Sequence, residues 1–178
     1  MIRINVTSQT ADLRTLQALP SQLQKALGLA RRDAIKTLYG YAAKLTAEQN
    51  YITQSEVKKA TRIEPTGLRV RSGMRALDKY KVSPKAPRKR GYPLMGAVKR
   101  GGLKPLGANA FLKRSGGKWR PYVRITPDRK PYKLLYGPSI AQLVGSENNL
   151  PLIEERAHEL FTNRAKYWTD RLTGGRRK

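Results

Sequence analysis

The stretch over residues 19–50, LPSQLQKALGLARRDAIKTLYGYAAKLTAEQN, limits the possible folds more than any other part of the sequence. Its apolar residues return every three or four positions, at Leu23, Leu27, Ala30, Ala34, Leu38, Tyr41 and Leu45. Pro20 and Ser21 favour the first turn of a helix, and Lys25, Arg32 and Lys36 fall off the apolar stripe. The spacing therefore predicts one long amphipathic helix over residues 21–49.

Two further helices are predicted from shorter patterns. Thr53 and Glu56 have the spacing of a capping box, in which each side chain satisfies the other residue's exposed backbone N–H. A short helix is therefore expected over residues 54–61. After Pro151, apolar residues return at helical spacing, at Ile153, Ala157, Leu160, Phe161, Trp168 and Leu172. This pattern predicts a C-terminal helix that stops before Gly174.

The remaining patterns are those of short strands and turns. Segments with alternating or β-forming residues are 2–6, 67–72, 77–84, 95–100, 110–115 and 118–125. Residues 67–72 and 77–84 are candidates for pairing with each other. Gly116 and Gly117 stand between the last two segments, where a tight hairpin turn needs positive φ. A further turn is predicted at Gly137 and Pro138. The sequence predicts one α+β domain over residues 1–178, with an antiparallel sheet packed by the long N-terminal helix and the C-terminal helix.

The charge is the next constraint. Lysine and arginine together number 37 against 12 acidic residues, which gives a formal net charge of +25 at pH 7. Such a surface attracts polyanions or acidic partners and repels copies of itself. The basic residues are concentrated in the middle of the chain, because no acidic residue occurs between Asp78 and Asp128.

The densest part of this region is KAPRKRGYPLMGAVKRGGLK, residues 85–104. Its basic residues are Lys85, Arg88, Lys89, Arg90, Lys99, Arg100 and Lys104. Its prolines and glycines favour extended chain, so residues 79–109 are predicted to form a long basic extended arm or loop within the domain. Within it, Tyr92, Leu94 and Met95 are expected to act as an apolar anchor. A mobile basic tail is expected over residues 173–178.

Two interpretations of the basic region stay open. Lysine and arginine neutralise nucleic-acid phosphates and release counterions, and nearby aromatic residues are able to stack on bases. Alternatively, the same charge forms a solvated face or an arm that lies on an acidic protein neighbour. No recognition helix, zinc finger or aromatic RNA-binding motif is present, so any nucleic-acid contact would depend on charge and shape.

The sequence does not contain the residues of a recognisable catalytic site. There is no cysteine and a single histidine, His158, so neither a disulfide nor a histidine–cysteine metal site is expected. The phrase SGGK at 115–118 lacks a phosphate-binding loop's other residues, because Leu112 and Trp119 replace the required glycine and serine or threonine. We predict no enzymatic activity, cofactor or metal. No secretion signal or membrane-spanning apolar run is visible, so we expect synthesis in the cytoplasm and no membrane contact.

Several phrases resemble the phage minor tail protein Z, or tail completion, family. In order along residues 20–172 they are SEVKKATRI (55–63), AFLKRSGGKWRPYVRI (110–125), LLYGPSIAQLV (134–144) and a closing amphipathic helix. The most specific is YGPS, Tyr136 to Ser139. GANAF, Gly107 to Phe111, replaces the GAF phrase typical of the hairpin.

This resemblance implies a structural virion protein of a long-tailed phage. Such proteins complete the head-proximal end of the tail and contribute to head-to-tail joining, and they have no enzymatic activity. The implied assembly is a homo-oligomer, a hexameric ring around the DNA channel, in contact with tail terminator or tail tube proteins and head-closure or neck proteins. Genomic DNA and the tape measure protein are further implied contacts. The alternative from charge alone is a stand-alone, sequence-nonspecific nucleic-acid-binding protein of the ribosomal or nucleoid kind.

Overall fold

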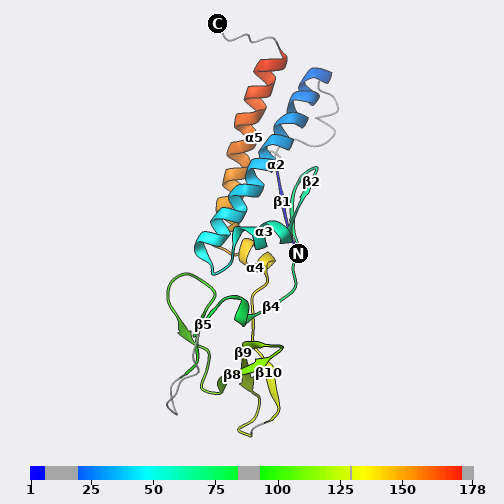
Figure 1. Cartoon of the computed structure of the whole chain (residues 1–178). Coiled ribbons are helices and arrows are strands. Elements are labelled where there is room, and N and C mark those ends of the chain that lie inside the picture. The colour runs from blue at the N-terminus through cyan, green and yellow to red at the C-terminus, as the bar shows by residue number, and fades with distance from the viewer. Residues whose placement is uncertain (7–19, 84–92, 129, 174–178) are drawn as a thin grey trace.

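The computed structural model of the chain describes residues 1–6, 20–83, 93–128 and 130–173. These residues form an elongated molecule, with a pair of long helices at one end and a group of short strands at the other (Figure 1). Helices and antiparallel strands occur together, so the predicted α+β class is confirmed. The predicted basic tail, apart from Thr173, lies outside the described residues.

Helix α2 (Ser21–Gln49) and helix α5 (Leu150–Leu172) run antiparallel, side by side (Figure 1). The bounds of α2 are those predicted. Helix α5 begins just before Pro151, because a proline in the first turn loses no intrahelical hydrogen bond. The buried face of α2 is rich in alanine, which allows close packing. Between the helices, Trp168 Nε1 donates to Asp33 Oδ2 at 2.9 Å.

Two short helices lie near the end of this pair where α2 ends and α5 begins (Figure 1). Helix α3 (Gln54–Ala60) has the predicted capping box, since the Glu56 N–H donates to Thr53 Oγ1 at 3.3 Å and the Thr53 N–H donates to Glu56 Oε2 at 3.0 Å. Helix α4 (Ile140–Val144) is absent from the sequence prediction, which places only a turn there. A second capping box begins this helix.

A three-stranded antiparallel sheet packs against the helices. Its strands, in spatial order, are β1 (Ile2–Asn5), β3 (Gly67–Val70) and β2 (Thr61–Glu64). Buried residues of β1 and β3, including Ile4 and Leu68, join the apolar core with residues of α2, α4 and α5. The main core of the described chain therefore lies between the helical pair and this sheet.

The predicted pairing of residues 67–72 with 77–84 is wrong. Strand β3 has β1 on one side and β2 on the other, so neither of its edges is available. The later segment forms the 3₁₀ helix η1 (Leu77–Lys79) and strand β5 (Lys81–Val82). The physical reason is that the N-terminal strand, distant in sequence, takes the second edge of β3.

The other strands form three further antiparallel sheets. They are β4 (Arg75–Ala76) with β11 (Tyr136–Gly137), β5 with β6 (Met95–Ala97) and β7 (Lys104–Pro105), and β8 (Ala110–Ser115) with β9 (Lys118–Arg124) and β10 (Tyr132–Leu134). The structure thus divides the predicted sheet into four. The predicted β8–β9 hairpin is confirmed, with φ of 58° at Gly116 and 77° at Gly117.

Candidate functional site

The described part of the predicted arm is a small folded sheet. Residues 84–92 lie outside the described residues, and this gap contains five of the predicted site residues: Lys85, Arg88, Lys89, Arg90 and Tyr92. Strands β5, β6 and β7 pair with one another on either side of the gap. The described part of residues 79–109 thus contains short paired strands, at Lys81–Val82, Met95–Ala97 and Lys104–Pro105, where the sequence predicts an extended arm or loop.

The two described anchor residues lie at the start of this sheet. Leu94 is fully buried and Met95 is half-buried in β6. The backbone carbonyl of Leu94 accepts a hydrogen bond from the Leu106 N–H at 2.8 Å. Leu94 is thus buried within its own chain, and its backbone bond to Leu106 joins two parts of the same segment.

Arg100 holds the same segment to the end of helix α2. Its backbone N–H donates to the Gln49 carbonyl at 2.8 Å. Its Nε lies 3.2 Å from the Ala47 carbonyl oxygen and 3.1 Å from that of Asn50. A cation at these carbonyls also complements the negative end of the helix dipole. Lys99, Arg100 and Lys104 are all exposed, but the guanidinium of Arg100 also makes these contacts within the chain.

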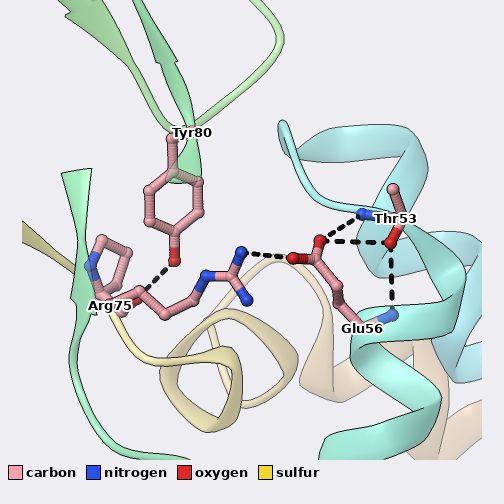
Figure 2. A network of polar contacts seen from close by, with 5 residues as sticks. Thr53, Glu56, Arg75 and Tyr80 are labelled. Atoms are coloured by element: carbon pink, nitrogen blue, oxygen red, sulfur yellow. Dashed lines mark hydrogen bonds and ion pairs between the residues drawn. The ribbon is translucent and has the colours of Figure 1, made fainter. Parts of the chain in front are cut away.

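A polar network joins the helical end of the molecule to its strands (Figure 2). Arg75 reaches from β4 to helix α3, where its Nη2 lies 2.6 Å from Glu56 Oε1. The guanidinium of Arg75 also lies over the ring of Tyr80, 5.3 Å from its centroid, and the Tyr80 hydroxyl donates to the Pro138 carbonyl. We call Glu56, Arg75, Tyr80 and Pro138 the joint.

Burial and the charges of the joint shift the pKa values of two of its groups. Burial raises the pKa of Glu56, but hydrogen bonds from Arg75 and Thr53 and the charge of Arg75 outweigh burial, so this pKa falls below 4.5. Burial raises the pKa of Tyr80 above its ordinary value, against the effect of the nearby Arg75 cation. Both shifts favour the charge states in which Glu56 is ionised and Tyr80 remains a hydrogen-bond donor.

Beyond the joint, the β8–β10 sheet carries a surface of rings and cations. Strand alternation and register place Phe111, Lys113, Tyr122, Arg124 and Tyr132 on one face, which we call the aromatic-basic face. The same alternation places Arg114, Trp119 and Lys133 on the opposite face. Asp78 and Arg120, 3.7 Å apart, tie this sheet to η1 beside the joint.

The rings of the aromatic-basic face form one cluster. Phe111 stacks on Tyr122 with centroids 6.1 Å apart, and Tyr132 meets the two rings edge-on at 5.8 Å and 5.3 Å. Cations lie over two of the rings, with Lys113 Nζ 4.4 Å from the Tyr132 centroid and the Arg124 guanidinium 5.4 Å from that of Phe111. Lys113 donates to the Tyr132 hydroxyl, and this bond together with the charge of Lys113 lowers the pKa of Tyr132.

A cavity of about 660 Å³ opens on this face. Its lining contains three cations and no acidic residue, and consists of Phe111, Leu112, Lys113, Arg124, Lys130 and Tyr132. The sequence predicts a different candidate site, on residues 85–104. The alternation of β8 and β9 already groups Phe111 with Lys113, but only the pairing of β10 brings Tyr132 beside them.

Among the described residues, no group of three or more histidine, cysteine, aspartate or glutamate side chains is placed to hold a metal ion. None of the helices in this part of the chain is long and apolar enough to cross a membrane. No protein-family model, curated protein or solved structure matches the chain.

Proposed function

We propose that the chain is a structural virion protein of a long-tailed phage, which completes the head-proximal end of the tail and contributes to head-to-tail joining. The proposal starts from the tail-completion phrases, of which YGPS is the most specific. What supports it in the structure is the role of that phrase, because it forms part of the joint between the two ends of the molecule.

Three of the four residues, Gly137, Pro138 and Ser139, have a structural task at or beside the joint. A side chain on Gly137 would place its Cβ only 2.8 Å from the Tyr80 ring, so glycine allows the ring to pack there. Pro138 supplies the carbonyl that accepts from Tyr80, and Ser139 caps helix α4 by accepting from the Gln142 N–H at 3.2 Å. The YGPS motif thus connects β11 to α4, and this structural role is consistent with a structural protein.

The proposed assembly is a hexameric ring at the head-proximal end of the tail. Copies that each carry +25 repel one another, so such a ring needs acidic neighbours or DNA to offset the charge. Tail terminator, tail tube, neck and tape measure proteins are the proposed neighbours. The β5–β7 sheet and residues 84–92 are the proposed assembly segment, whose exposed described cations are Lys81, Lys99, Arg100 and Lys104.

Immunogold electron microscopy of nuclease-treated particles tests this placement. Label confined to the junction of head and tail is the expected result. Particles without label, with the protein recovered on cellular nucleic acid, would contradict the tail role and favour the stand-alone nucleic-acid-binding alternative. Particles washed in high salt sharpen the result, because binding through phosphates alone weakens steeply with salt.

A charge-reversal experiment tests the assembly segment. A phage genome that lacks the gene is complemented with Arg88→Glu, Lys89→Glu and Arg90→Glu together, and loss of infectious particles is expected. The matched control reverses Lys25, Arg32 and Lys36, which are exposed on α2, and thus makes the same change in formal charge. Equal infectivity of both triple variants and the unchanged protein would refute the role of residues 88–90, whereas equal loss would assign the effect to net charge.

A further inference from the structure

Register also places Arg120 on the aromatic-basic face, where it pairs with Asp78 of η1, but the rings of this face belong to no apolar core among the described residues. Pro121 is the single buried residue of the three strands of the β8–β10 sheet, and none of their residues belongs to the apolar core. The rings on this face are half-buried, while Lys113, Arg124 and Lys130 are exposed around the cavity. Apolar surface rimmed by charged residues is typical of interaction sites, and this face combines three half-buried rings with three exposed cations.

We propose that the aromatic-basic face binds single-stranded nucleic acid without base-sequence preference. Bases stack on the Phe111 and Tyr132 rings, and phosphates pair with Lys113, Arg124 and Lys130. The inference goes beyond the tail role and concerns a surface separate from residues 85–104.

The rings favour nucleic acid over an acidic protein segment. An acidic peptide would pair with the cations but would make no specific use of clustered aromatic rings. Every base has a planar face, and stacking on an aromatic side chain contributes about 1–3 kcal/mol per base. The Arg124 guanidinium over Phe111 offers a second flat surface of the kind that bases stack on.

The same rings favour a single strand over a duplex. Bases in a duplex are stacked on one another and present only their edges in the grooves, so aromatic side chains cannot reach their faces. An unpaired strand can turn its bases toward the sheet and its phosphates toward the surrounding cations. The cavity of about 660 Å³ lies within the size range of sites for small ligands, so it is large enough to admit a base.

Binding exchanges contacts that already exist. In the described structure, Lys113 covers Tyr132 and Arg124 covers Phe111. A phosphate is a stronger partner for each cation than a neutral ring, because the pair is charge-assisted. When the cations turn to the phosphates, the rings become accessible to the bases. The two kinds of contact are thus formed together on one face.

Fluorescence anisotropy with labelled oligothymidylate of about 12 nucleotides, a length typical of single-strand sites, tests the proposal. The decisive variant is Lys113→Gln with Arg124→Gln, and its matched control is Arg114→Gln with Lys133→Gln. Both remove two positive charges from the same sheet, but from opposite faces. We expect the first pair to weaken binding at least tenfold more than the control, and to make the log–log salt slope shallower by about 1.4. Equal losses of affinity in the two double variants would overturn the proposal.

Stacking is tested separately at Tyr132. Replacing Tyr132 with leucine should weaken binding about tenfold, whereas Tyr132→Phe, which keeps the ring, should bind like the unchanged protein. Trp119→Leu on the opposite face is the control, and circular dichroism checks that each variant is folded. A Tyr132→Leu protein that binds normally would refute stacking. Tighter binding of a matched duplex, or of polyglutamate at equal charge, would assign the face to duplex DNA or to an acidic protein. None of these outcomes bears on the immunogold result.

Discussion

The helical pair and the β8–β10 sheet are stabilised in different ways. Helix α2 buries a long apolar stripe against α5 and the β1–β3 sheet, and Leu38 in its middle is 0% exposed. The β8–β10 sheet buries only Pro121 and depends on strand hydrogen bonds and the ring cluster. Burying a large aliphatic side chain contributes about 1.5–3 kcal/mol, while an aromatic pair adds about 0.5–1.5 kcal/mol.

The difference shows which end of this chain contributes most apolar burial and which end leaves its side chains near water. The helical end supplies most of the apolar burial. The strand end keeps its rings and cations near water, where a ligand can reach them. The joint between them is polar, so the orientation of the two ends depends on Arg75, whose side chain is only 11% exposed, and on its partner Glu56.

Removing apolar bulk tests the contrast most strongly. Leu38→Ala should lower the free energy of unfolding by about 2–5 kcal/mol, because it leaves a cavity in the core. Val123→Ala in β9, where the side chain is half-buried, should cost less than about 1.5 kcal/mol, because little apolar burial is lost. Urea denaturation followed by circular dichroism measures both. Similar losses in the two variants would show that the sheet has a core of its own.

Glu56→Gln tests the joint. Glutamine keeps the capping-box geometry but removes the charge that pairs with Arg75, so a loss of about 1–3 kcal/mol is expected at pH 7. Because the folded-state pKa of Glu56 lies below 4.5, its contribution is present above about pH 4.5 and is lost as the pH falls through the folded-state pKa. The difference between the two proteins should therefore shrink in acid, as unfolding measured from pH 7 to pH 3 will show. A difference independent of pH would contradict the ion pair's role.

Glycine substitutions should have opposite signs in the two regions. Gly28→Ala in α2 should stabilise the protein by about 0.5–1 kcal/mol, since nothing lies within 4 Å of the added Cβ and alanine favours helix. Gly117→Ala at the hairpin turn, where φ is 77°, should cost about 1–2 kcal/mol. Thermal unfolding of both variants gives the comparison. Stabilisation by Gly117→Ala would show that the hairpin turn differs from the one described.

Tryptophan fluorescence should give the smallest effect, a difference in quenching. Trp119, which is 60% exposed, reports on the sheet, while Trp168, held by Asp33, reports on the helical pair. Acrylamide should quench the Trp168→Phe variant, which retains Trp119, more strongly than the Trp119→Phe variant. Equal quenching would mean that the surface of the sheet is covered in solution.

The sequence predicts well those features that depend on neighbours along the chain. Helix α2, the capping box of α3 and the β8–β9 hairpin are all confirmed, because periodicity, caps and glycine turns act within a few residues. Helix α4 has a local signal that was available, the pairing of Ser139 with Gln142 three residues later. The preceding Gly137 and Pro138 obscure this signal, because the two residues together are typical of a turn.

Tertiary structure decided the pairings between distant segments. The net charge, the long helices and the alternation that groups Phe111 with Lys113 are all predictable from the sequence alone. Three features were not predictable from it: the pairing of β1 with an edge of β3, the contact of Arg100 with the end of α2, and the placement of Tyr132 in the ring cluster by β10. Each of these depends on which segments meet in space, and that choice is made by the burial of the whole chain rather than by local propensity.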